Sequence, residues 1–110
     1  MTNSNIEFYN YYYIKINDNI NSLNYKSDYD SIIYLLKHTM NLLKEFDTKI
    51  ENYDMKNHII QFKELYRDVE DELKFCKTKK YYEKWYIINN KIEKFIHIFF
   101  VKIKEHLKIV

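Results

Sequence analysis

The chain has 110 residues and a formal net charge of +2, with no glycine, no proline and a single cysteine. This length fits one domain, 1–110. The missing glycine excludes glycine-rich phosphate loops and argues against a many-stranded sheet, because tight hairpin turns need residues that tolerate positive φ. One cysteine excludes an intrachain disulfide and fits a reducing compartment.

Codon bias explains much of the remaining composition. Alanine is absent and Arg67 is the only arginine, whereas isoleucine, lysine, asparagine, tyrosine and phenylalanine are abundant. The abundant residues have AT-rich codons, so we infer an AT-rich genome, compatible with a virus, an intracellular parasite or a low-GC bacterium. The abundance of tyrosine or lysine is therefore not, by itself, evidence for a binding site.

The first predicted helix covers residues 4–24. Ser4 and Glu7 have the spacing of a capping box, and an apolar stripe follows with three- and four-residue steps: Ile6, Tyr9, Tyr13, Ile16, Ile20 and Leu23. Residues 8–14 are rich in strand formers, so this helix has the weakest propensity of the four. Its outer face carries few charges and presents amphipathic rings, which makes Phe8, Tyr11 and Tyr12 a candidate protein interface.

The second and third helices are predicted over 28–52 and 54–77. A capping box from Ser27 to Asp30 begins the second helix, whose wide stripe is Ile32, Leu36, Leu43, Phe46, Ile50 and Tyr53. The stripe then changes phase, so we expect a break near 52–54 with Asn52 or Asp54 as the next cap. The third stripe is Met55, Ile59, Phe62, Tyr66, Val69, Leu73 and Cys76.

The fourth helix is predicted over 79–109, with Thr78 as its cap. The alternative is a continuous rod from 55 to 110, which would need a second chain to cover it. The stripe begins with Tyr81, Trp85, Ile88, Ile92, Phe95 and Phe99 and then widens. The added apolar residues either lie at the centre of a bundle or are covered by a partner. Ile96, Phe100 and Ile103 are therefore further candidates for a protein interface.

Four amphipathic helices with short connections predict an all-α fold, a single up-down four-helix bundle. Residues 1–13 lack the pattern of a secretory signal. The longest uncharged run of the last helix, 95–101, is far shorter than the ~20 residues of a membrane span. We expect a soluble intracellular protein, cytoplasmic by default, without a transmembrane segment.

The residues that usually carry chemistry do not form a catalytic or metal-binding pattern. Two histidines follow a carboxylate by four residues, Asp54/His58 and Glu93/His97, which predicts surface pairs, with His58 flanking the core. His106 continues the inward stripe. Di-iron bundles use Glu-x-x-His motifs, and none occurs here. Cys76 lies on an inward stripe, so we expect a buried thiol and not a nucleophile. We therefore expect no catalytic residue, no metal and no cofactor, and hence no enzyme.

Charge is distributed unevenly along the chain. Up to residue 55 there are five lysines and eight acidic residues, and after it thirteen basic and eight acidic residues. Lysines alternate with aromatic residues where the third and fourth helices meet, and this junction is a candidate anion contact: Lys77, Lys79, Lys80, Lys84 and Trp85. Lysines contact phosphates and aromatic rings stack on bases, although an acidic protein or anionic lipid would fit as well.

Two functional hypotheses follow from the sequence. The first is a small non-catalytic protein that acts through helix-face contacts, either with itself as a homodimer or with a host or competitor protein. The second is binding to nucleic acid or another polyanion through the lysine-rich junction.

Overall fold

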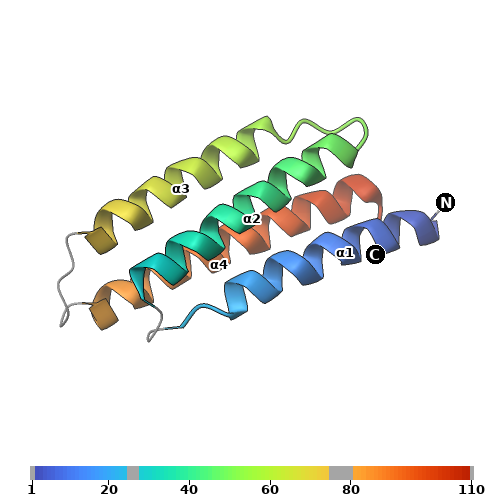
Figure 1. Cartoon of the computed structure of the whole chain (residues 1–110). Helices are drawn as coiled ribbons and strands as arrows, with labels where there is room; N and C mark the ends of the chain where they lie inside the picture. The colour runs from blue at the N-terminus through green and yellow to red at the C-terminus, as the bar shows by residue number, and fades with distance from the viewer. Residues whose placement is uncertain (1, 25–27, 75–80, 110) are drawn as a thin grey trace.

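The computed structural model describes residues 2–24, 28–74 and 81–109, and within these residues it contains four α-helices and no strand. Helix α1 spans Thr2–Asn21, α2 Tyr29–Lys49, α3 Lys56–Lys74 and α4 Tyr81–Leu107. Successive helices run in opposite directions (Figure 1). The predicted all-α, up-down four-helix bundle is confirmed.

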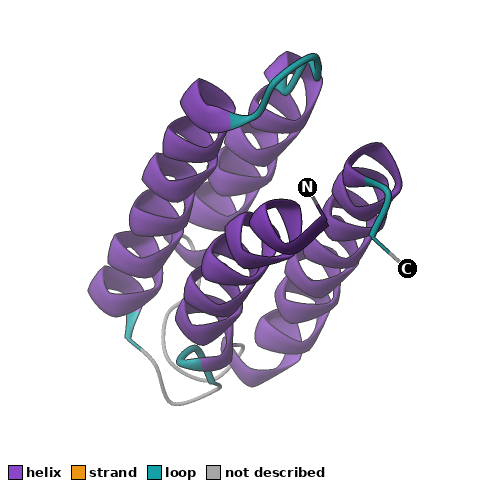
Figure 2. Ribbon diagram, turned by 90° about the vertical axis from the view of Figure 1, so that its right-hand side faces the viewer, coloured by secondary structure: helices purple, strands orange, loops and turns teal. Residues whose placement is uncertain are grey.

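The helices form a closed ring around one core. Each helix packs against the next, and α1 also packs against α4. The beginning of α1, the end of α4 and the α2–α3 loop lie at the same end of an elongated molecule of 51 × 22 × 19 Å (Figure 2). At this end, Asn5 Nδ2 donates a hydrogen bond to Leu107 O at 3.4 Å. The alternative of one rod from 55 to 110 is wrong, because α3 and α4 lie side by side.

Aromatic rings fill the centre of the bundle, and each helix contributes at least one. The ring of Phe99 lies 6.0 Å from Phe46 and 4.9 Å from Phe100, and the ring of Phe62 lies 5.2 Å from that of Phe95 in a tilted contact. Because α4 faces both α1 and α3, its wide apolar stripe is covered from two sides. The excess of apolar residues after Ile92 therefore belongs mainly to the core of this chain.

Both ends of α2 and the start of α3 differ from the predicted bounds, because local hydrogen bonds fix them. Asp28, rather than Ser27, caps α2: its carboxylate accepts a hydrogen bond from Ser31 N at 2.7 Å. Helix α2 ends at Lys49, and Asn52 then adopts a left-handed φ of 56°, which asparagine tolerates better than most residues. Asp54 accepts a hydrogen bond from Lys56 N at 2.9 Å, so it satisfies a free donor at the start of α3 as predicted.

Helix α4 ends in a Schellman motif built without glycine. Lys108 has a φ of 57°, Ile109 N donates to Lys104 O at 3.0 Å, and Lys108 N donates to Glu105 O at 3.2 Å. The predicted break before α4, with Thr78 and Cys76, lies outside the described residues.

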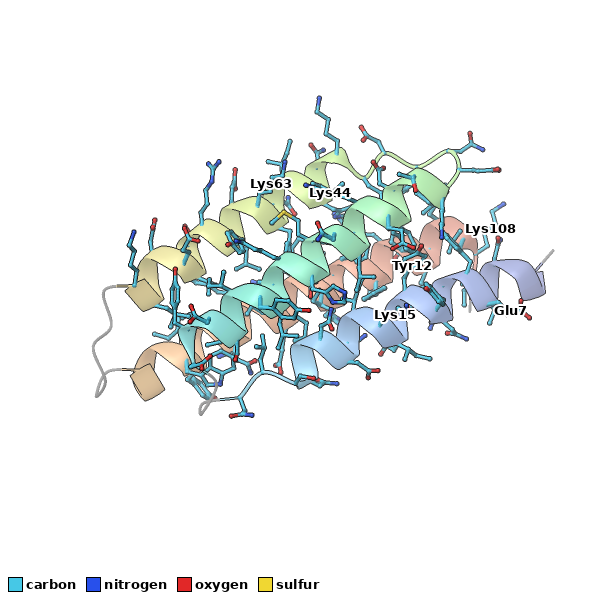
Figure 3. The ribbon with its side chains drawn as sticks, in the orientation of Figure 1. Glu7, Tyr12, Lys15, Lys44, Lys63 and Lys108 are labelled. Carbon is cyan, nitrogen blue, oxygen red and sulfur yellow. The ribbon has the colours of Figure 1, made fainter. Side chains whose placement is uncertain are left out.

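Helix α1 departs from the predicted stripe at Ile6 and Tyr13, which are exposed, whereas the other four members of that stripe are buried as predicted: Tyr9, Ile16, Ile20 and Leu23. It begins at Thr2, so Ser4 lies within the helix and not before its first residue. Tyr12, expected on the outer face, is 1 % exposed, whereas Tyr13, expected inside, is 42 % exposed. The reason is tertiary: Tyr12 packs edge-on against Phe46 at 4.8 Å and donates its hydroxyl hydrogen to Glu45 Oε1 at 3.0 Å. Figure 3 shows Tyr12 between α1 and α2.

Candidate functional site

Most of the predicted interface residues are buried inside the chain. Tyr12, Ile96, Phe100 and Ile103 are buried in the core, and Phe8 is partly buried with its ring stacked 4.8 Å from Phe46. Tyr11 alone is well exposed, and Lys15 Nζ lies 4.5 Å from its ring centre. These six residues do not form one surface, because periodicity alone could not show which apolar positions the neighbouring helices would cover.

The lysine-rich junction is only partly described. Lys77, Lys79 and Lys80 lie outside the described residues, as does the side chain of Lys84. Trp85 is buried, 8 % exposed, so its ring packs in the core and is not available for stacking on a base. Binding of a polyanion at this junction stays a prediction.

The histidines make polar contacts that hold the fold together. His58 is buried on α3, and its Nε2 lies 2.6 Å from the Tyr53 hydroxyl and its ring 5.1 Å from Phe99. Burial, followed by the positive charge of Lys102, lowers the pKa of His58, so the imidazole is neutral near pH 7. Its partner is therefore Tyr53, and the predicted surface pair with Asp54 is wrong.

His106 lies next to this cluster at the end of the bundle. Its Nε2 donates to Glu51 O at 2.8 Å and its ring lies 4.8 Å from Tyr53. A depression of about 540 Å³ beside it is lined by side chains of both signs, including Lys49, Glu51 and Lys108. Among the described residues, no group of three or more histidine, cysteine or acidic side chains could hold a metal ion.

A groove of about 380 Å³ runs between α1 and α4, and we call it the α1–α4 groove. Its floor is apolar, because Tyr9, Ile96 and Phe100 are buried beneath it, and its edges are polar. The complete lining is Tyr9, Tyr13, Asn17, Ile20 and Asn21 from α1 and Glu93, Ile96, His97, Phe100, Val101 and Lys104 from α4. Tyr13 spans the groove, with its ring 5.0 Å from that of Phe100.

Exposed apolar side chains surround this groove. Tyr13 and Val101 line it and are each 42 % exposed, and Ile14 follows Tyr13 on α1 with 57 % exposure. Ile6 is exposed as well, seven residues and so two turns before Tyr13. We call Ile6, Tyr13 and Val101, together with the groove, the α1–α4 face. The sequence signal for it was the nearly uncharged outer side of α1, although Tyr13 itself was placed in the inner stripe.

The α1 side of the α1–α4 face carries few charges, whereas its α4 side contributes Glu93 and Lys104 to the groove. Helix α1 carries only Glu7, Lys15 and Asp18 as charged side chains, whereas nine of the nineteen residues of α3 are charged. Asn17 and Asn21 provide the polar groups of the α1 side of the groove. Depletion of charge around exposed aromatic and aliphatic side chains is typical of the central part of a protein–protein interface.

The fold and this face define an all-α, up-down four-helix bundle with a groove between its first and last helices. A comparison of the chain with protein-family models, curated proteins and solved structures finds no match. Within its described residues, no helix is long and apolar enough to cross a membrane.

Proposed function

We propose that this protein is a non-catalytic, intracellular binding module that acts through protein–protein contact at its α1–α4 face. The observation that carries the proposal is the combination found there: a groove with an apolar floor, exposed Tyr13 and Val101 at its edges, and few charges on its α1 side. Exposed apolar patches bordered by polar residues, when they are large, mark sites of interaction with proteins, membranes or ligands.

The chemistry of the other clusters supports the same proposal. Tyr53, His58 and His106 bind one another and the backbone, so they stabilise the loop between α2 and α3. Tyr12, Glu45 and Lys49 form a second polar link, between α1 and α2, with Lys49 Nζ 3.3 Å from Glu45 Oε1. Both clusters use their polar atoms within the fold, whereas the α1–α4 face leaves its apolar atoms exposed.

Site-specific photo-crosslinking in cells tests this proposal. A photoreactive amino acid replaces Val101 on the α1–α4 face, and in a matched control it replaces Ile60, which is exposed to nearly the same extent on α3, 43 % against 42 %. We expect discrete protein adducts from position 101 and none from position 60. No adduct from position 101, or the same adducts from both positions, would contradict the proposal.

A further inference from the structure

The loop between α2 and α3 lies at the end of the bundle where α4 also ends (Figure 1), and buried residues anchor it on both sides. Ile50 before it is 8 % exposed, and Met55 after it is fully buried. Between these anchors, Asn52 adopts its left-handed φ. No backbone–backbone hydrogen bond involves residues 51–54, all of which the structure describes. This segment can therefore move away from the bundle without breaking a backbone hydrogen bond of any helix.

Two imidazoles hold the loop against the bundle. The hydroxyl of Tyr53 lies 2.6 Å from His58 Nε2, and the two rings stack with their centres 5.7 Å apart. The other neighbour of the Tyr53 ring is His106, at 4.8 Å, whose Nε2 also donates a hydrogen bond to Glu51 O. The attachment of the loop therefore depends on side chains that titrate near neutral pH.

His58 is enclosed between the core and the loop. The ring of Phe99 meets it edge-on at 5.1 Å on the core side, and the ring of Tyr53 covers it on the loop side. Burial, followed by the positive charge of Lys102, lowers the pKa of His58. A protonated His58 is thus a buried cation near a second cation, which is unfavourable until water reaches the imidazole.

The surrounding charged groups do not offset a charge on His58. No described acidic side chain forms a hydrogen bond or an ion pair with it. Burial, followed by the charges of Asp54 and Glu105, raises the pKa of Tyr53, so this residue stays a neutral phenol in acid. The charged side chains of the elements around His58 are Asp47 and Lys49 at the end of α2, Glu51 and Asp54 in the loop, Lys56 on α3, and Lys102 and Glu105 on α4.

We propose that residues 51–54 form a pH-sensitive loop: when His58 takes up a proton, Tyr53 leaves the imidazole and the loop moves away from the bundle, while the four helices stay packed. Displacing Tyr53 breaks one side-chain hydrogen bond and two ring contacts. Unfolding the helices would break the whole core, so local opening is the less costly way to hydrate the charge. The closed loop favours the neutral imidazole and the open loop favours the charged one, so acid shifts the equilibrium towards the open loop.

This inference goes beyond the proposed function and does not depend on it. None of the residues that hold the loop lines the α1–α4 groove. Opening of the loop changes a different part of the surface, the depression lined by Glu51, Asn52 and His106.

Nuclear magnetic resonance of the purified full chain, from pH about 7.5 to about 4.5, tests the opening. The nuclear Overhauser effect between the rings of Tyr53 and His58 should be lost, with the same midpoint as the titration of the His58 ring protons and below about pH 6.5. The effect between Phe62 and Phe95, whose ring centres lie 5.2 Å apart in the core, should persist. A Tyr53–His58 effect that persists after His58 has titrated, or that disappears only together with the core effect, would overturn the proposal.

Two matched variants identify the group that takes up the proton. His58→Gln keeps a neutral acceptor for the Tyr53 hydroxyl, so the effect between the rings of Tyr53 and His106 should persist in acid. His106→Gln removes the neighbouring imidazole and retains His58, so the Tyr53–His58 effect should still be lost. Loss of the Tyr53–His106 effect in His58→Gln, or a loop of His106→Gln that no longer responds to acid, would show that His58 is not the sensor. Circular dichroism at neutral pH checks that both variants are folded, and the wild-type titration alone decides whether the loop opens.

Discussion

The register of α1 can be tested with two adjacent tyrosines that have the same chemistry. Tyr12 is 1 % exposed and Tyr13 is 42 % exposed, although the spacing of apolar residues alone favours Tyr13 as the inner one. Replacing each by alanine removes the same atoms from the same helix with the same change in helix propensity. Any difference between Tyr12→Ala and Tyr13→Ala therefore reports how deeply each ring is packed.

The structure gives the size of this difference. The ring of Tyr12 lies 5.5 Å from Phe8, 4.9 Å from Tyr11 and 4.8 Å from Phe46. Truncation of a fully buried aromatic side chain costs about 3–5 kcal/mol of unfolding free energy. Tyr13→Ala loses mainly its ring contacts with Tyr9 and Phe100, worth about 1 kcal/mol. For a domain of this size we expect the midpoint of thermal unfolding to fall by more than about 12 °C for Tyr12→Ala.

Thermal and urea unfolding followed by circular dichroism measure both variants. Tyr12→Phe is the companion variant: it retains the ring and removes only the hydroxyl that donates to Glu45 at 3.0 Å, so it should cost about 0.5–1 kcal/mol. If Tyr13→Ala destabilises the protein as much as Tyr12→Ala does, the register of α1 and the exposed position of Tyr13 in the groove are both refuted.

Three further variants test the polar contacts. Burial and then Lys102 lower the pKa of His58, so as the pH falls below about 6.5 the unfolded chain takes up the proton first and the folded protein loses stability; thermal unfolding against pH should show this loss, and His58→Gln should flatten it. Asp28→Ala removes the cap of α2 and should cost about 1 kcal/mol in urea unfolding, and an unchanged midpoint would argue against that cap. Lys108→Gly should raise the unfolding free energy by about 1 kcal/mol, because glycine adopts a left-handed φ at no steric cost; a lower midpoint would show that the Lys108 side chain contributes more than its backbone strain costs.

The number and type of the elements could be predicted from local information. The three- and four-residue steps from Ile88 to Phe99 define a helical face regardless of what covers it. The change of phase between Tyr53 and Met55 marks a break, since no single helix can bury both stripes. The bounds were less accurate because they depend on hydrogen bonds of single side chains, such as those of Asp28 and Asp54.

The candidate site could not be predicted in the same way. Phe100 and Ile96 were candidates for an interface because α4 has more apolar positions than one stripe requires. In the bundle α4 is covered from two sides, by α1 and by α3, and both residues are buried. The exposed residue Val101 directly follows the buried Phe100 on α4. On α1, the exposed residue Tyr13 directly follows the buried Tyr12. A shift of one residue rotates a side chain by about 100°, which is enough to move it from the core to the surface.

The sequence by itself determined that this protein is a single bundle of four helices. The three- and four-residue spacing of its apolar residues predicts the helices, and the absence of glycine disfavours the tight turns of a sheet. Only the tertiary structure decided which of two neighbouring tyrosines is buried and where an exposed apolar groove remains. The physical reason is that periodicity records how a helix repeats along its own axis, whereas burial depends on the distance and angle of the neighbouring helices. The α1–α4 face results from that packing, and it could not be identified before the positions of both helices were known.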